Sequence, residues 1–321
     1  MLKFVHVSDE KWDRECNDMG GTWKHRSLWY QYKLLSPNTY DCRKLIYDGE
    51  RVVGALPLML EDNLTEGTSQ YTMGGGPLPS LLYCGSHEYR DMENILDHVK
   101  ELSKTNDVAR IHIDGDVPSY DAYTAYHRVI SGGTVNVSHG NAKIIAAMSD
   151  KYKVENENNF VYFSNKYEEI AGKSTHTDKQ WSVLRLMYGL GIMQVYRITR
   201  LGDYPPCGYV AIFVDNNSAY YAMGAVEEQA KKDGAGVVLL SSVISSMLHI
   251  GRIFDIGEQP YPSSVCGPTG KELTIAQFKR GFGGVTVRDR SSEMFFNVVY
   301  KRKVYAERLE QEIQQHVEVR G

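Results

Sequence analysis

Apolar positions along the first half of the chain predict a hairpin, a helix and a strand, in that order. Lys44–Leu60 contains two apolar runs joined by Asp48-Gly49, a dipeptide that favours a two-residue hairpin turn. Asp91–Thr105 has its apolar residues at the spacing of an amphipathic helix. Val108–Asp114 alternates between apolar and polar residues, which predicts a strand with one face buried.

The same order of elements is predicted in the second half. The expected elements are two hairpin strands, a loop, a helix and a strand: Cys207–Val214, Ser218–Val226, Glu227–Gly234, Gly236–Ile250 and Arg252–Gly257. A tandem pair of related α/β domains explains this recurrence with one assumption, and chance recurrence of a common α/β pattern is the alternative. We therefore expect one domain over residues 1–150 and a second over residues 151–321.

Three further segments have a recognisable pattern. The polar run Lys153–Asn159 predicts an exposed loop, and Trp181–Leu190 predicts a helix that ends at Gly191. Val304–Val317 predicts a short amphipathic helix through Tyr305, Leu309, Ile313 and Val317. Because this helix spans less than three heptads, we expect it to pack on its own domain rather than form a coiled coil.

Composition narrows the class of protein. The 321 residues carry a formal net charge of −4, whereas a general nucleic-acid binder would show a basic excess. The five widely spaced cysteines contain no Cys-x-x-Cys pair, which favours free thiols over a disulfide framework or a zinc site. The sequence contains neither a signal-peptide pattern nor an apolar run long enough to span a membrane, so we expect a soluble, cytoplasmic protein without a metal.

The helix predicted at Gly236–Ile250 begins with features of an anion site. Gly234, Ala235 and Gly236 leave backbone N–H groups free at a helix start, where the helix dipole favours negative charge. Lys231 and Lys232 precede them and add positive charge. The alternative is a glycine-rich turn that leads into a buried helix.

Two charged residues follow this helix. If Ile253 faces the core, Asp255 lies on the same side of its strand, where burial raises the pKa of a carboxyl group toward that of a general base. The alternative is a solvated strand end, or an ion pair with Arg252 or Lys279. Lys279 lies in a glycine-rich segment and is able to stabilise a phosphate or a developing oxyanion.

These segments resemble a known superfamily. A hairpin, an anion-binding loop, a helix and an acid-bearing strand occur in this order in the GNAT N-acyltransferases. The run Asp255-Ile256-Gly257, followed by Phe278–Gly284 (FKRGFGG), is similar to that of the tandem Fem-like transferases and their sugar N-acyltransferase relatives. Thr22–Tyr32 and Tyr47–Leu60 also resemble the first domain of that group. The resemblance implies two tandem GNAT-like domains, each a mixed, mostly antiparallel sheet flanked by helices.

The resemblance also implies a reaction. Lys231, Lys232, Gly234, Ala235 and Gly236 would hold the diphosphate of an acyl-CoA co-substrate, although Lys231 replaces the glutamine or arginine of the common GNAT loop. An amine would attack the thioester carbonyl, with Asp255 and Lys279 on the acyl or acceptor side. Tyr261 or Tyr221 would protonate the leaving thiolate, and Cys266 would be an incidental thiol.

The first domain and the cleft between the halves would bind the acceptor. Trp23, Arg26 and Trp29 offer aromatic faces and a cation, and Tyr221 and Glu258 complete the expected substrate side. We expect the acceptor to be a dTDP- or UDP-linked aminodeoxysugar of O-antigen or capsule synthesis, which receives an acetyl or longer acyl group such as 3-hydroxybutanoyl. The alternatives are a Fem-like peptidoglycan aminoacyltransferase that uses aminoacyl-tRNA, and a non-catalytic module that binds a nucleotide sugar.

Overall fold

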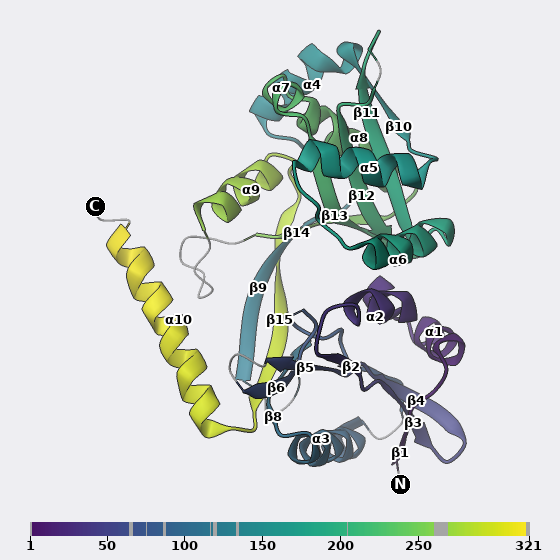
Figure 1. Ribbon diagram of the computed structural model, residues 1–321, viewed down its shortest axis with the longest axis vertical. Coiled ribbons are helices and arrows are strands. Elements are labelled where there is room, and N and C mark those ends of the chain that lie inside the picture. Colours follow the sequence, from purple (N-terminus) through teal and green to yellow (C-terminus); the bar gives the residue numbers. More distant parts are fainter. Residues whose placement is uncertain are drawn as a thin grey trace. The chain divides into compact units, whose positions relative to one another are not determined.

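The computed structural model describes residues 2–63, 67–74, 76–85, 88–115, 117, 121–132, 135–203, 205–259 and 269–318 (Figure 1). Its contacts divide the chain into two compact units. Unit 1 consists of Met1–Ala125, Pro262–Gly267 and Asp289–Gly321, and unit 2 consists of Tyr126–Tyr261 and Pro268–Arg288. Residues 289–321 thus belong with the N-terminal part of the chain, so unit 1 is not one continuous stretch of sequence.

Unit 1 contains two sheets. The first is antiparallel and has the order β1 (Leu2–Val5), β3 (Lys44–Asp48), β4 (Arg51–Leu56) and β7 (Leu82–Tyr83). The second has the order β15 (Val285–Phe295), β8 (Val108–Asp114), β6 (Thr68–Tyr71), β5 (Met59–Asn63) and β2 (Thr39–Asp41), with one parallel pair, β6 and β8. The predicted hairpin is therefore confirmed as β3 and β4, and the strand predicted at Val108–Asp114 is confirmed with its bounds.

The helices of unit 1 precede and follow these strands. They are α1 (Asp9–Asp18), η1 (Trp23–His25), α2 (Ser27–Lys33), α3 (Glu88–Thr105) and α10 (Val298–Glu318). Tyr30, Leu58, Met59 and Tyr71 are all 0% exposed and form the centre of the core. The predicted helix at Asp91–Thr105 is confirmed as α3.

The C-terminal helix α10 packs on unit 1 through its first half. Tyr300 and Val304 are buried in a cluster with Ala109. Tyr305, Leu309 and Ile313 are 42%, 56% and 54% exposed, so the expectation that these three residues form the packed face is wrong. The residues of α10 that contact the sheet are Tyr300 and Val304, which precede the apolar face that was predicted to begin at Tyr305.

Unit 2 is built on a six-strand arrangement. Its order is β10 (Tyr152–Asn156), β11 (Met193–Arg200), β12 (Gly208–Val214), β13 (Ser218–Val226), β14 (Ile253–Glu258) and β9 (Asp121–Ile130). All neighbours in this order are antiparallel except β13 and β14, which are parallel. The expected class, a mixed and mostly antiparallel sheet flanked by helices, is confirmed.

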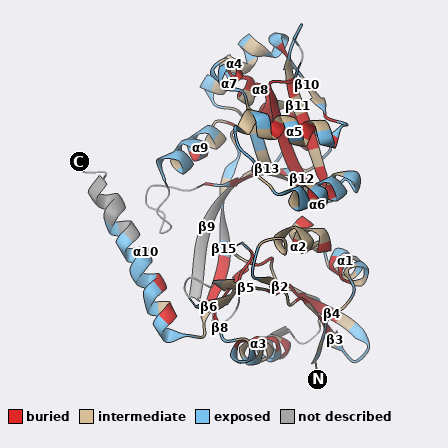
Figure 2. Cartoon of the chain, viewed as in Figure 1, coloured by how far each residue is buried: buried red, intermediate tan, exposed pale blue. Residues whose placement is uncertain are grey.

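Helices cover both faces of this sheet. The buried helix α8 (Ala235–His249) packs across one face, while α5 (Phe160–Ala171) and α6 (Asp178–Gly189) lie on the other (Figure 1). The remaining helices are α4 (His139–Met148), η2 (Ser149–Lys151), α7 (Glu228–Lys232) and α9 (Gly270–Arg280). Buried residues concentrate on α8 and the strands beneath it (Figure 2). Leu239, Val243 and Ile244 of α8 are 0% exposed, and burial of each such side chain contributes about 1.5–3 kcal/mol.

Three local predictions in unit 2 were wrong. Residues 153–159 were expected to be a loop, but residues 152–156 form the strand β10. The stretch 227–234 was expected to be a loop, but it contains the helix α7. Ile253 is 43% exposed and the core instead takes Phe254 and Ile256, which are both 0% exposed. Two large apolar side chains bury more surface than one, so the strand turns Asp255 away from the core.

Two buried histidines of unit 1 predict that stability depends on pH. Burial lowers the pKa of both His25 and His112 to about 4. As pH falls from about 6.5, the unfolded chain takes up protons that the folded chain excludes until the pH nears 4. We therefore expect the free energy of unfolding to fall by up to roughly 3 kcal/mol for each histidine between about pH 7 and pH 4.5.

Urea unfolding across this pH interval measures the effect. The His112→Gln variant removes one of the two groups, so its stability should depend less steeply on pH than that of the unmodified chain. A free energy of unfolding that stays constant over the interval would contradict the prediction.

Candidate active site

The parallel strands β13 and β14 pair over only three residues each. Ser218–Tyr220 pairs with Ile253–Asp255, and the two strands make no further pair with each other in the described residues. β13 continues to Val226 beside β12, while β14 continues to Glu258 and pairs with β9. The strands therefore separate after Tyr220 and Asp255, and the edge of β13 that follows is not bonded to β14.

Asp255 and Gly257 shape the end of β14. The backbone N–H of Gly257 donates to Oδ1 of Asp255 at 2.7 Å. The Asp255 carboxylate is therefore directed along its own strand, toward the residues that follow it. Gly257 has a φ of +88°, a conformation that glycine adopts at low cost. A β-carbon at this position would lie 3.1 Å from Nζ of Lys279 and 3.5 Å from Oη of Tyr220. The glycine thus lets a lysine and a tyrosine approach the strand where it leaves its neighbour.

Lys279 reaches this point from the last turn of α9. The helix begins at a capping box in which Thr269 and Glu272 bond each other's backbone N–H groups. At the other end, Nζ of Lys279 donates to the carbonyl oxygen of Glu258 at 3.3 Å and lies 5.9 Å from the ring centroid of Tyr221. A cation and two tyrosines therefore lie near the end of β14, and the carboxylates of Asp255 and Glu258 are close enough to act on the charge of the cation.

Burial changes the acidity of two of these groups. Burial lowers the pKa of the Lys279 ammonium, and the negative charges of Glu258 and Asp255 oppose this effect. Burial raises the pKa of Tyr221 to about 12, which keeps its hydroxyl protonated at neutral pH. The cluster accordingly provides a desolvated cation able to stabilise an oxyanion and a hydroxyl able to donate a proton.

Four of the predicted site residues lie in this cluster: Asp255, Lys279, Tyr221 and Glu258. Tyr261 and Cys266 lie outside the described residues. Tyr220 and Gly257 also lie in this cluster but were not among the predicted site residues, although a glycine two residues after the acid of a strand was a usable signal.

Gln259 is a further residue that sequence reasoning missed. Its side chain is 1% exposed, and its Nε2 donates to the same Glu258 carbonyl that accepts from Lys279. Its Oε1 has no hydrogen-bond partner in the described part of the chain. A buried acceptor of this kind needs a donor, and a substrate N–H or O–H would supply one.

The predicted anion loop is more enclosed than expected. Gly234 has a φ of +87° and begins α8, while Ala235 is 0% exposed. Lys231 and Lys232 lie on α7 with exposed side chains, and Nζ of Lys231 is 3.4 Å from Oε2 of Glu228. The two lysines and the helix start are adjacent, as the sequence predicted, but the backbone of the helix start is covered.

The cover comes from α4. A β-carbon on Gly234 would lie only 2.4 Å from Cγ2 of Ile144. The same helix also approaches the end of α9, because the backbone N–H of Ser138 donates to the carbonyl oxygen of Gly281 at 2.9 Å. Ile144 therefore packs against Gly234 at the N-cap of α8, whereas Gly236 in the first turn stays partly exposed.

The predicted aromatic cluster lies in unit 1. Trp23 is 7% exposed, and its ring meets that of Trp29 edge to face at 4.9 Å. Trp29 also stacks on Tyr32 at 5.2 Å, with Nζ of Lys33 4.8 Å from the Trp29 ring. Arg26 donates to Oδ1 of Asn17 at 3.0 Å rather than joining this stack. Trp23 and Trp29 thus lie together, while Arg26 is directed to α1.

Two kinds of feature are absent from the residues that the structure describes. No group of His, Cys, Asp and Glu side chains among them is arranged to hold a metal ion. None of the helices described is both long and apolar enough to cross a membrane. The cysteines that the structure describes, Cys16, Cys42, Cys84 and Cys207, are free thiols.

Comparison with solved structures identifies the fold. The structure of FemX superposes with a TM-score of 0.68 at 11% identity, covering 94% of this chain and 99% of that one. A tandem GNAT protein from the clavulanic acid biosynthesis pathway, solved without AcCoA, gives a TM-score of 0.52 at 16% identity, covering 92% and 98%. The chain has a tandem GNAT fold.

A third match is the structure of L-PGS from Bacillus licheniformis, with a TM-score of 0.61 at 10% identity and coverage of 94% of this chain and 96% of that one. No protein-family model matches the sequence, and no curated protein sequence does. At these identities the likeness concerns the tandem GNAT fold alone. The activity therefore has to be argued from the side chains.

Proposed function

We propose that this protein is an N-acyltransferase whose reaction takes place where β13 and β14 separate. The observation that carries the proposal is the meeting of Lys279, Tyr221, Asp255 and Glu258 at that point. The free edge of β13 beyond Tyr220 offers backbone groups along which an extended donor can bind. The donor we propose is an acyl-CoA.

Transfer needs a nucleophilic amine and a stabilised tetrahedral intermediate. Asp255 or Glu258 holds the acceptor ammonium and takes its proton, directly or through water. The amine nitrogen then bonds to the thioester carbonyl carbon, and the Lys279 ammonium stabilises the negative oxygen. The C–S bond breaks as the intermediate collapses, and the Tyr221 hydroxyl protonates the leaving thiolate. The attacking nitrogen loses its second proton in the same collapse, and this proton restores the Tyr221 hydroxyl through water. The products are an amide and a free thiol.

The acceptor we propose is a nucleotide-linked aminodeoxysugar of cell-surface polysaccharide synthesis. One feature of the structure supports it: the buried acceptor oxygen of Gln259, which a hydroxyl or amine hydrogen of the sugar would satisfy. The resemblance of the sequence to sugar N-acyltransferases points the same way.

A panel of acyl-CoAs against dTDP- and UDP-linked aminosugars tests this proposal. Free thiol is measured with a disulfide reagent, and the amide product is identified by mass. We expect at least one pair to release thiol and amide in equal amounts. Thiol release without a matching amide would mean hydrolysis and would count against an amine acceptor.

A second donor is favoured by one observation. Ile144 covers the start of α8, where the CoA diphosphate would bind. An aminoacyl ester, such as the 3′ end of aminoacyl-tRNA, presents the same reactive carbonyl and requires no diphosphate cradle. The same reaction would then transfer an aminoacyl group to the amine of a peptidoglycan precursor.

Thermal stability distinguishes the two donors. If CoA binds the folded chain, CoA at about a hundred times its Kd should raise Tm by roughly 5–10 °C. The Ile144→Ala variant should increase that shift, because it uncovers the amides at the start of α8. The control variant Ile145→Ala, in the same helix, should not increase it. No CoA-dependent shift in any of the three proteins would favour the ester donor.

A further inference from the structure

The strand β10 ends the sheet of unit 2, and its outer edge can be assigned residue by residue. The backbone N–H of Glu157 donates to the oxygen of Val195, and that of Leu201 donates to the oxygen of Lys151. In an antiparallel ladder such pairs alternate with pairs whose N–H and C=O groups point away from the partner. The backbone groups of Tyr152, Val154 and Asn156 therefore point outward, away from β11.

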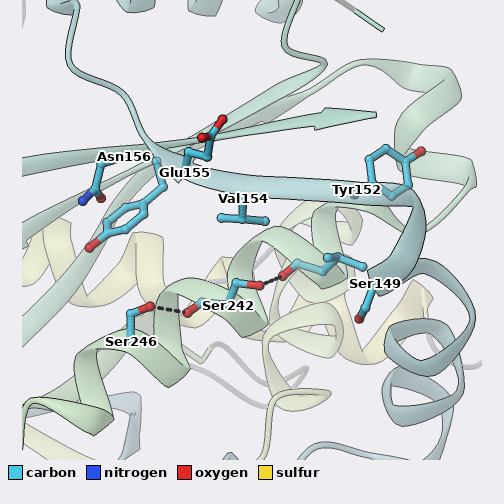
Figure 3. Close-up of a pocket in the computed structure, with 9 residues that line it drawn as sticks. Ser149, Tyr152, Val154, Glu155, Asn156, Ser242 and Ser246 are labelled. Atoms are coloured by element: carbon cyan, nitrogen blue, oxygen red, sulfur yellow. Dashed lines mark hydrogen bonds between the residues drawn. The ribbon is translucent and has the colours of Figure 1, made fainter. Parts of the chain in front are cut away.

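A cavity of about 340 Å³ borders this edge. It is lined by β10 residues, by Tyr196 of β11, and by Ser242 and Ser246 of α8. Figure 3 shows Val154 and the two serines facing each other across this space. Ser242 and Ser246 donate their hydroxyl hydrogens to backbone oxygens of their own helix at 2.9 Å each. The cavity thus lies between β10 and α8, and in the described strand order β10 has a neighbouring strand only on its β11 side.

The charges on β10 are complementary to those of a second, antiparallel copy of the same strand. Lys153 and Glu155 flank Val154, and Nζ of Lys153 is 2.7 Å from Oε1 of Glu155. When two copies of this strand run antiparallel with Val154 opposite Val154, each Lys153 lies opposite a Glu155. The same register places Tyr152 opposite Asn156, so that every outward-facing residue meets another outward-facing residue.

We propose that β10 is a docking strand for a second copy of this chain, paired antiparallel about a two-fold axis at Val154. Each outward pair exchanges two main-chain hydrogen bonds, which joins the two sheets edge to edge. The interface is isologous, since the same residues serve on both sides. The two cavities face each other across the axis and close over the paired strands.

Charge complementarity selects a second copy over an unrelated peptide. Charged residues at a sheet edge usually prevent pairing, because most registers place like charges together. In β10, the antiparallel register with Val154 opposite Val154 places each Lys153 opposite a Glu155. A single reversal at either position converts both cross-strand pairs to like charges.

Variants in which the charge of Lys153 or Glu155 is reversed test the proposal. The experiment measures the mass of the protein in solution and not its activity, so the result does not depend on the proposed reaction. Sedimentation equilibrium of the full chain should show a monomer–dimer equilibrium. Lys153→Glu and Glu155→Lys should each raise the dimer Kd by at least about tenfold, because both cross-strand pairs become repulsive. An equimolar mixture of the two variants should form a heterodimer, detected by native mass spectrometry, with a Kd close to that of the unmodified chain.

Two further variants separate dimer loss from misfolding. Val154→Pro removes an N–H that points away from β11, so the chain should fold and be monomeric. Lys179→Glu reverses an exposed charge on α6 and should leave the dimer Kd unchanged. The proposal is overturned if the unmodified chain is monomeric at every concentration. It is also overturned if the Val154→Pro variant has the same dimer Kd as the unmodified chain. A mixture of the two reversal variants that forms no heterodimer would also overturn it.

Discussion

The Lys279→Met variant should lower kcat/KM for acyl transfer by roughly 100- to 1,000-fold, which is the usual cost of removing one oxyanion-stabilising group. Methionine keeps the length of the partly buried stem but removes the charge that lies beside Gly257 and Tyr221. Because the charge acts on the intermediate, we expect the loss mainly in kcat. Steady-state rates of thiol release with the active substrate pair measure it.

The matched control is Lys271→Met, which removes an exposed lysine from the first turn of the same helix. Its kcat/KM should stay within about twofold of that of the unmodified chain. Both variants should keep the melting temperature, since neither lysine anchors the core. Equal rates for Lys279→Met and Lys271→Met would remove Lys279 from the mechanism.

The pH profile gives a second view of the same residue. Burial lowers the pKa of Lys279, so the active protonated form is lost at a lower pH than for an ordinary lysine. The unmodified chain should therefore lose kcat at alkaline pH, and this limb should be absent from the profile of Lys279→Met. Persistence of the limb in the variant would assign it to another group.

Glu293→Ala should be the most destabilising of the substitutions considered, with a loss of about 3–5 kcal/mol of unfolding free energy. Glu293 is 1% exposed and accepts hydrogen bonds from Arg110 at 3.0 Å and from two nitrogens of Arg308 at 2.9 Å. Its removal leaves the largely buried Arg110 guanidinium without this carboxylate and removes the hydrogen bonds that link Arg308 of α10 to β15. Urea unfolding at neutral pH measures the loss.

An exposed glutamate of α10 is the control. Oε1 of Glu307 lies 3.8 Å from Nζ of Lys303, and both side chains are about half exposed. Glu307→Ala should cost less than about 1 kcal/mol, as surface ion pairs do. If both alanine variants lost the same free energy, the buried network would have no special role in anchoring α10.

Acidification should reproduce part of the Glu293 effect. Burial alone would raise the pKa of Glu293, but the hydrogen bonds and charge of Arg308 outweigh it and lower the pKa overall. A carboxyl group with a lowered pKa contributes stability at neutral pH and loses that contribution as pH falls below the ordinary glutamate range. The free energies of unfolding of the unmodified chain and of Glu293→Ala should converge at low pH.

The parts of the fold predicted well are those whose apolar pattern is local. Val108–Asp114 was found with its bounds because alternation marks a strand regardless of its neighbours, and Ser218–Val226 because turn residues precede it. β10 was missed because an edge strand needs no apolar alternation, and its polar residues resemble those of a loop. The membership of α10 in unit 1 depends on contacts between residues far apart in sequence, which no local pattern encodes.

The sequence predicted several residues of the candidate site but not their arrangement in space. Asp255, Lys279, Tyr221 and Glu258 were selected, but Tyr220 and Gly257 were not, because their role depends on the register between two parallel strands. The glycines before α8 were recognised as a helix start, whereas their cover by Ile144 comes from a segment about ninety residues earlier. Packing between distant segments therefore limits what the sequence alone predicts.

In the mechanism that we propose, the reactive carbonyl of the donor lies where β13 and β14 separate. A crystal structure of the chain with an amide-linked, unreactive analogue of the active donor tests it most directly. We predict that the carbonyl oxygen will lie within about 3.5 Å of Nζ of Lys279, the distance expected for a group that acts on it. A donor bound with its carbonyl away from Lys279, Tyr220 and Tyr221 would contradict the account.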